Sequence, residues 1–226
     1  MFSFIVGVII YLVFFWNWEK ACQPYYNINQ SIFIGHRGSP QLITENTLPS
    51  FDRAIQQGVD GLEFDIRLSK DNQIVVFHDK DLKRLSDKTE QVEQLSLAEL
   101  QTIELHKQPN QVEDVYIPSL KELVPLLARV KVVNIEIKSD SLFHGHGIIK
   151  PLIQFLDKYH LDDKCIISSF NPLILMKLRL KRPDTIIGFL YNSKHLFSVW
   201  DIPNLFVLFY YSYIIILIIV GGVFVL

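Results

Sequence analysis

Between residues 31 and 191, short apolar runs alternate with segments in which apolar residues recur at helical spacing. The apolar runs predict strands beginning near residues 31, 61, 74, 132, 165 and 185. Strands that alternate with helices are typical of βαβ units and a parallel sheet. The pattern therefore predicts an α/β fold. Six strands fall short of the eight of a closed (β/α)8 barrel, so such a barrel would be open or completed by the C-terminal tail.

Uncharged apolar segments stand at both ends of this region. Residues 1–18 contain no charge before Glu19, and residues 202–226 contain none after Asp201. A membrane-crossing helix needs about 20 apolar residues, so the first segment predicts a short uncleaved anchor and the second a transmembrane segment. The alternative is buried strands and a core helix, because Ile, Val, Tyr and Phe also favour strands. The length rule favours a protein located at a membrane and anchored by one or both ends.

Composition narrows the class of protein. Hydrophobic residues make up 49 % of the chain and charged residues 20 %, which indicates a folded core rather than disorder. The net charge of -2 and the lack of a basic cluster interleaved with aromatic residues argue against a nucleic-acid partner. The two cysteines, Cys22 and Cys165, fit neither a disulfide framework nor a zinc site.

Carboxylates occupy two of the predicted strands. Glu63 and Asp65 are separated by one residue, and Glu136 and Lys138 are separated in the same way in "NIEIK". Alternate residues of a strand point to one face about 6.5 to 7 Å apart, so each pair projects together. Either pair alone would be typical of an exposed ion-pair face. Together, Glu63, Asp65 and Glu136 form a hard oxygen site suited to Mg²⁺ or Ca²⁺.

Further polar residues end the neighbouring strands. His36 and Arg37 end the first predicted strand, and His78 ends the third. In α/β barrels the C-terminal strand ends form the catalytic mouth. Histidines can serve as general acid and base near neutral pH, while Arg37 and Lys138 supply donors for a phosphoryl group. Burying charged groups without partners is energetically unfavourable, so these side chains are expected to bind something. Their combination at one end of the sheet predicts metal-assisted hydrolysis of a phosphate ester.

Several longer motifs carry a family resemblance. The segments "IGHRGSPQLITENTLPSF", "GLEFDIRLSKDNQIVVFHD", "IPSL", "NIEIK" and "SSFNPLILMKLR" resemble the glycerophosphodiester phosphodiesterase family, in the family's order, over residues 31–191. The resemblance implies a TIM-type (β/α) barrel that uses a divalent cation to cleave glycerophosphodiesters to glycerol 3-phosphate and an alcohol. The charged stretch after Lys80 is similar to the family's small insertion. Within it, residues 82–88 ("LKRLSDK") are predicted to form a solvated face.

The resemblance also implies a role for each matching residue. His36 and His78 would form the acid/base pair, and Arg37 and Lys138 would bind phosphate. Glu45 and Asn46, in "TENT", would shape and hydrogen-bond the site. The cation would be held by Glu63, Asp65 and Glu136.

The chain departs from the family's pattern at one end. Family members continue after the "GFLY" strand with two more β/α units, which the final uncharged run does not resemble. Their absence would open the barrel beside the first strand and expose an unpaired sheet edge.

Three hypotheses follow. The first is a membrane-anchored, metal-dependent phosphodiesterase acting on glycerophosphodiesters or lysophospholipids. The second is a catalytically inactive, truncated and membrane-tethered relative, which a lack of metal-dependent turnover would identify. The third is a lysophospholipase D or sphingomyelinase D-type phosphodiesterase, against which the "GHRG…TENT" block and the "NIEIK" strand argue.

Overall fold

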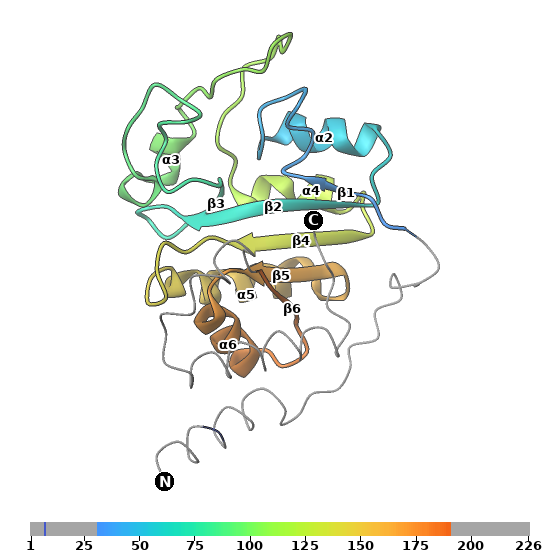
Figure 1. Cartoon of the computed structure of the whole chain (residues 1–226), viewed down its shortest axis with the longest axis vertical. Coiled ribbons are helices and arrows are strands. Elements are labelled where there is room, and N and C mark those ends of the chain that lie inside the picture. Colours follow the sequence, from blue (N-terminus) through green and yellow to red (C-terminus); the bar gives the residue numbers. More distant parts are fainter. Residues whose placement is uncertain (1–6, 8–30, 191–226) are drawn as a thin grey trace, which may run out of the picture.

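The computed structural model describes residue 7 and residues 31–190 (Figure 1). Its strands are β1 (Ile34–His36), β2 (Gly61–Leu68), β3 (Ile74–Val76), β4 (Val132–Ile137), β5 (Cys165–Ser169) and β6 (Ile186–Phe189). Its α-helices are α2 (Leu48–Gln56), α3 (Leu97–Leu100), α4 (Val124–Leu127), α5 (Ile149–Tyr159) and α6 (Pro172–Lys181). Short 3-10 turns are η1 (Val92–Gln94), η2 (Leu120–Leu123), η3 (His146–Ile148) and η4 (Asp162–Lys164).

The two apolar segments predicted to meet a membrane lie outside the described residues, apart from Gly7. Among the helices that the structure does describe, none has the length and apolar character needed to cross a bilayer. The predicted membrane location therefore stays a prediction from the sequence.

Five strands form a parallel sheet in the order β1-β2-β4-β5-β6, which confirms the predicted α/β class. The third predicted strand differs, because β3 pairs with β2 in the antiparallel sense. Only residues 69–73 separate these two strands, and a parallel connection needs a dozen residues or more. The count of about six β/α units was therefore wrong within the described region: five strands are parallel, and the sixth closes a hairpin.

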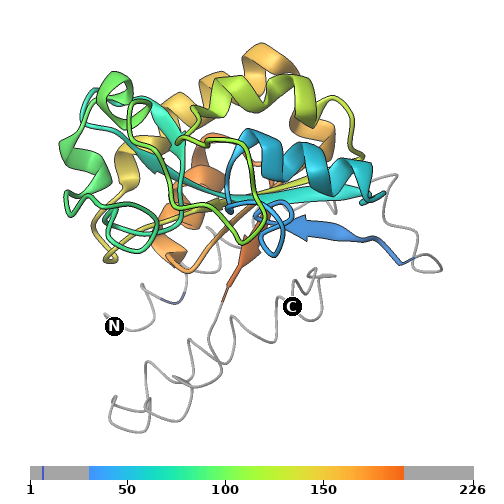
Figure 2. The same cartoon turned by 90° about the horizontal axis from the view of Figure 1, so that it is seen from above.

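Along the sheet, β1 pairs with β2 and β6 pairs with β5, so both are edge strands within residues 31–190. Helices α2, α4 and α5 stand on one side of the sheet (Figure 2). Alternate residues of β2 and β4 face them and are fully buried, as Phe64 and Ile135 show. Phe64 meets Phe51 of α2 edge to face, with ring centroids 5.8 Å apart. This apolar layer anchors the sheet by removing its helix-facing side from water.

The intervening residues of the same strands carry a different chemistry. Glu63 and Asp65 of β2, Glu136 of β4 and Ser168 of β5 are all buried. The strand register places Asp65 opposite Glu136, and Glu136 opposite Ser168. Because side chains alternate between faces along a strand, these polar groups line the face away from the helices. The sheet thus has one apolar and one polar buried side.

Residues 77–117 form a second, smaller apolar cluster around Phe77, Leu82, Leu100, Leu105 and Ile117. Figure 1 shows this segment beside the ends toward which the arrows of β2 and β4 point. Residues 77–117 also form hydrogen bonds with the loop that follows β1. The Thr44 hydroxyl donates to the backbone oxygen of His106 at 2.6 Å, and the Thr44 N–H donates to Gln111 at 3.0 Å.

Candidate active site

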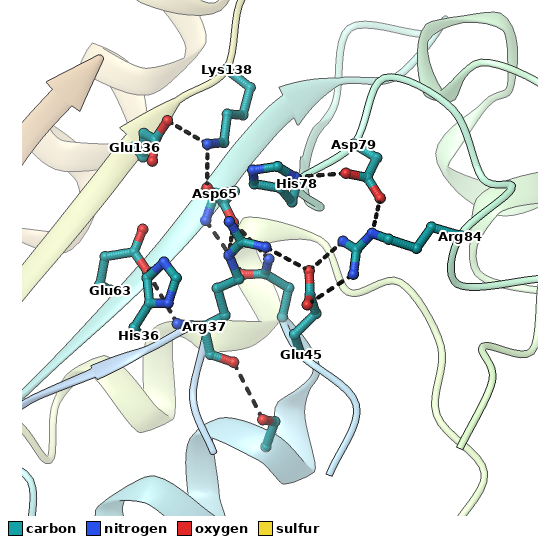
Figure 3. A network of polar contacts seen from close by, with 12 residues as sticks. His36, Arg37, Glu45, Glu63, Asp65, His78, Asp79, Arg84, Glu136 and Lys138 are labelled. Atoms are coloured by element: carbon teal, nitrogen blue, oxygen red, sulfur yellow. Dashed lines mark hydrogen bonds and ion pairs between the residues drawn. The ribbon is translucent and has the colours of Figure 1, made fainter. Parts of the chain in front are cut away.

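The polar face of the sheet leads to a cluster of charged side chains at the C-terminal ends of β1 and β4 and in the middle part of β2 that pairs with those ends. The structure brings all nine residues predicted from the sequence into this region, and Figure 3 labels all of them except Asn46, which hydrogen-bonds to Asp65. They are His36, Arg37, Glu45, Asn46, Glu63, Asp65, His78, Glu136 and Lys138. Their roles stay predictions, whereas their proximity is a feature of the structure.

The turn after β1 aims the Arg37 side chain into the cluster. Arg37 adopts a φ of 57°, a left-handed conformation that is uncommon for residues other than glycine. The conformation is held because its N–H donates to both the backbone and side-chain oxygens of Glu63, at 3.0 Å each. Gly38 continues the turn at φ 89°, where an added Cβ would lie 2.6 Å from the Ser50 hydroxyl oxygen. A strained, over-determined turn of this kind is typical of functional sites.

Three buried carboxylates form the centre of the cluster. One oxygen each from Glu63, Asp65 and Glu136 can be chosen so that all lie within 4.8 Å of one another. Asp65 is the best supported of the three. Its Oδ2 lies 3.1 Å from Arg37 Nε, and its Oδ1 lies 3.0 Å from Lys138 Nζ. Lys138 also forms an ion pair with Glu136.

Asn46 completes the support of Asp65. Its side-chain amide donates to Asp65 Oδ2 at 2.8 Å and accepts from the Asp65 N–H at 3.3 Å. Like Arg37, Asn46 has a φ of 57°, a conformation that asparagine tolerates better than most residues. These hydrogen bonds place Asn46 beside Asp65, while its role in the site stays a prediction.

The charges of the cluster do not balance. Burial, followed by repulsion from Asp65 and Glu136, raises the pKa of Glu63 to about 8. Burial also raises the pKa of Glu136, against the opposing effect of Lys138. Although burial acts in the opposite direction, Lys138 and Arg37 hold the pKa of Asp65 below its ordinary value. Three carboxylates facing two cationic side chains leave a deficit of positive charge. A hard divalent cation with oxygen ligands fits this deficit.

This imbalance predicts a pH-dependent stability of the cation-free protein. Because the pKa of Glu63 is raised to about 8 on folding, its contribution is fully present below its unfolded-state pKa and is lost as pH rises through about 8. In EDTA, we expect the melting temperature to fall between about pH 4.5, the ordinary pKa of a glutamate, and about pH 8. Added divalent cation should reduce this decrease in melting temperature. The Glu63→Gln variant should lack the part of the decrease that Glu63 causes. If thermal unfolding shows that the melting temperature of Glu63→Gln falls with pH as much as that of wild type, the raised pKa assigned to Glu63 is contradicted.

The two histidines approach the carboxylates from different segments. His36 Nε2 lies 3.8 Å from Glu63 Oε2, and the His36 side chain is 58 % exposed. His78 follows β3 and reaches the cluster because the β2–β3 hairpin reverses the chain. Its Nδ1 pairs with Asp79 Oδ1 at 2.7 Å, which leaves Nε2 turned toward Asp65 (Figure 3). Burial lowers the pKa of both imidazoles, so both are neutral near pH 7.

Sequence reasoning missed two supporting residues, Asp79 and Arg84. Arg84 Nε donates to Asp79 Oδ2 at 2.6 Å, and its two terminal nitrogens donate to the Glu45 carboxylate at 2.6 and 3.1 Å. Glu45 in turn binds Arg37 Nη1 at 2.9 Å. Arg84 is exposed, in line with the solvated face predicted for "LKRLSDK", but it also links the His78 side of the site to the Arg37 side. The position of Asp79 directly after His78 was the one available signal.

The parallel α/β sheet thus carries at its mouth an acidic site that could hold a metal ion, flanked by cationic side chains. The model of the glycerophosphoryl diester phosphodiesterase family matches residues 36–201. The chain belongs to this family, which confirms the predicted resemblance and the class of phosphoric diester hydrolases.

Individual relatives agree with this assignment. The chain is 34 % identical over 165 residues to a glycerophosphodiester phosphodiesterase of Caldanaerobacter subterraneus, covering 72 % of this chain and 68 % of the relative. It is 30 % identical to that of Bacillus altitudinis, covering 61 % of this chain but 57 % of the relative. The structure resembles an Oleispira antarctica phosphodiesterase in complex with sn-glycerol-3-phosphate. Its TM-score is 0.65 at 27 % identity, and the match covers 76 % of this chain and 72 % of that one.

Proposed function

We propose that this chain hydrolyses glycerophosphodiesters to sn-glycerol 3-phosphate and an alcohol, with a divalent cation. The observation that carries the proposal is the buried cluster of Glu63, Asp65 and Glu136, flanked by Arg37 and Lys138. Family membership supports the reaction class. The Oleispira antarctica relative, whose structure contains sn-glycerol-3-phosphate, supports this product.

The cation would be held by the oxygens of Glu63, Asp65 and Glu136, and we propose Mg²⁺ or Ca²⁺ because all three ligands are carboxylates. A bound cation would polarise a phosphoryl oxygen as a Lewis acid. In the chain itself, the fixed ion pairs of Asp65 with Arg37 and Lys138 keep the two cationic side chains beside the same carboxylate. This arrangement supports the proposal that both bind the anionic phosphodiester.

The histidines supply the proton transfers. Lowered pKa values keep His36 and His78 neutral before substrate arrives, which is the form that a general base requires. The negative charge of the phosphodiester then favours protonation of one imidazole, which can donate its proton to the leaving alkoxide. Asp79 holds His78 through Nδ1, so we assign Nε2 as the nitrogen that exchanges the proton.

The test is release of sn-glycerol 3-phosphate from glycerophosphodiesters by the full-length chain. We expect turnover with added Mg²⁺ or Ca²⁺ and loss of turnover with EDTA, because no cation would then be present to polarise a phosphoryl oxygen. Lys83→Gln is the control for a substitution outside the site, since the Lys83 side chain is 62 % exposed and its ion pair is with the nearby Asp81. It should behave as wild type.

Two other outcomes would redirect the proposal. A folded sample without turnover in any divalent cation would identify an inactive family member. Choline release from lysophosphatidylcholine, without sn-glycerol 3-phosphate release from glycerophosphodiesters, would favour the lysophospholipase D hypothesis.

A further inference from the structure

We propose that a cavity beside Lys138 binds the alcohol portion of the substrate and selects for polyol or anionic alcohols over quaternary ammonium groups. This inference rests on the proposed function and names its substrate class. The cavity has a volume of about 430 Å³ and lies between the β2–β3 turn, η1 and the loop from β4 to η3. That volume falls within the range typical of small-molecule sites, about 300 to 1,000 Å³.

The cavity begins where the carboxylate cluster ends. Lys138 contributes to its lining and also lies 3.0 Å from Asp65 Oδ1. Arg67 contributes as well, and its Nε donates to the backbone oxygen of His78 at 3.0 Å. Because Arg67 is two residues beyond Asp65 in β2, it lies on the same face of the sheet as Glu63 and Asp65. A phosphodiester bound at the cluster can therefore extend one of its two ester groups past Lys138 into the cavity.

Positive charge predominates in the lining. Two acidic residues contribute to it, and each already has a partner: Asp140 Oδ1 binds Arg67 at 3.1 Å, and Glu93 Oε2 lies 3.0 Å from His144 Nε2. Lys80 approaches Asp140 less closely, at 4.0 Å, and its side chain is 49 % exposed. The four cationic residues of the lining are Arg67, Lys70, Lys80 and Lys138.

The neutral part of the lining suits hydroxyl groups. Ser69, Asn72 and Gln94 offer hydroxyl and amide groups that can donate and accept hydrogen bonds. Among the described residues that line the cavity, none is Phe, Tyr or Trp. Quaternary ammonium groups are recognised by aromatic faces, so choline would meet neither an aromatic partner nor a favourable charge here. Glycerol, inositol and their phosphates carry the complementary groups.

The first experiment compares kcat/KM for glycerophosphoglycerol, glycerophosphoinositol and glycerophosphocholine, all of which release sn-glycerol 3-phosphate. We expect the first two to exceed the third by about tenfold or more, equivalent to about 1.4 kcal/mol. The double variant Lys70→Gln, Lys80→Gln should reduce this ratio several-fold, because kcat/KM for glycerophosphoglycerol and glycerophosphoinositol should fall while that for glycerophosphocholine should rise as two repelling charges are removed. Lys83→Gln is again the control, because it removes a positive charge outside the cavity. Equal use of glycerophosphocholine, or an unchanged ratio in the double variant, would overturn the proposal.

A second measurement separates the cavity from the reaction. Calorimetric titration with myo-inositol 1-phosphate should show weaker binding to the double variant than to wild type or Lys83→Gln. Equal binding to all three would overturn the cavity proposal, whatever the turnover. Weakened binding in the double variant, together with no sn-glycerol 3-phosphate from any substrate, would support the cavity and overturn the proposed function.

Discussion

Glu63→Gln should abolish cation-dependent hydrolysis while leaving the cation-free protein at least as stable as wild type at about pH 7. The activity should fall by about 10³-fold or more, because the bound metal stabilises transition-state charge by several kcal/mol. The stability should persist because the pKa of Glu63 is raised to about 8, so its carboxyl is largely protonated in the absence of a cation. A neutral amide then replaces a neutral acid. The measurements are sn-glycerol 3-phosphate release and urea unfolding in EDTA.

Asp65→Asn provides the contrast. It should abolish activity to a similar extent but also destabilise the fold, because Arg37 and Lys138 both rest on the Asp65 carboxylate. Removing one partner of a buried ion pair costs on the order of 3 kcal/mol. Equal losses of stability in Glu63→Gln and Asp65→Asn would contradict the different charge states that we assign to these two residues.

His78→Gln should reduce kcat by about 10²- to 10⁴-fold, the usual contribution of a positioned general acid or base. Arg84→Gln should reduce kcat by a smaller factor, about 10- to 100-fold. This is the usual effect of removing a residue that orients a metal-binding or catalytic side chain by hydrogen bonding to it. Arg84 acts through Asp79 and Glu45, which hold His78 and Arg37 respectively. Arg84→Lys should recover little, because lysine cannot reproduce three hydrogen bonds from one planar fork.

A change of leaving group distinguishes the roles of the two histidines. With a glycerophosphodiester that releases p-nitrophenolate, which needs no proton, the variant lacking the general acid should regain much of its lost rate. The variant lacking the general base should not. If neither His36→Gln nor His78→Gln is rescued, proton donation by these residues would be excluded.

The alternation of residues along the predicted strands was enough to predict most of the carboxylate cluster. The spacing of Glu63 and Asp65, and of Glu136 and Lys138, places them on one face wherever those segments form strands. What the pattern could not supply was long-range pairing. Arg84 follows Asp79 by five residues but follows Glu45 by 39 residues, and only the folded second cluster brings them together. The direction of β3 was available from the short turn, since residues 69–73 are too few for a parallel crossover.

The β2–β3 hairpin has a consequence for how this site can change in evolution. One continuous stretch of chain, residues 63–79, provides two of the three carboxylates, one imidazole and the partner of that imidazole. Inserting one residue into β2 would move its side chains to the opposite face, and lengthening the turn would displace His78 from Asp65. Insertions and deletions should therefore be excluded from this stretch. Length variation can instead accumulate in exposed parts of the second cluster, such as the stretch around Val112, whose side chain is 88 % exposed.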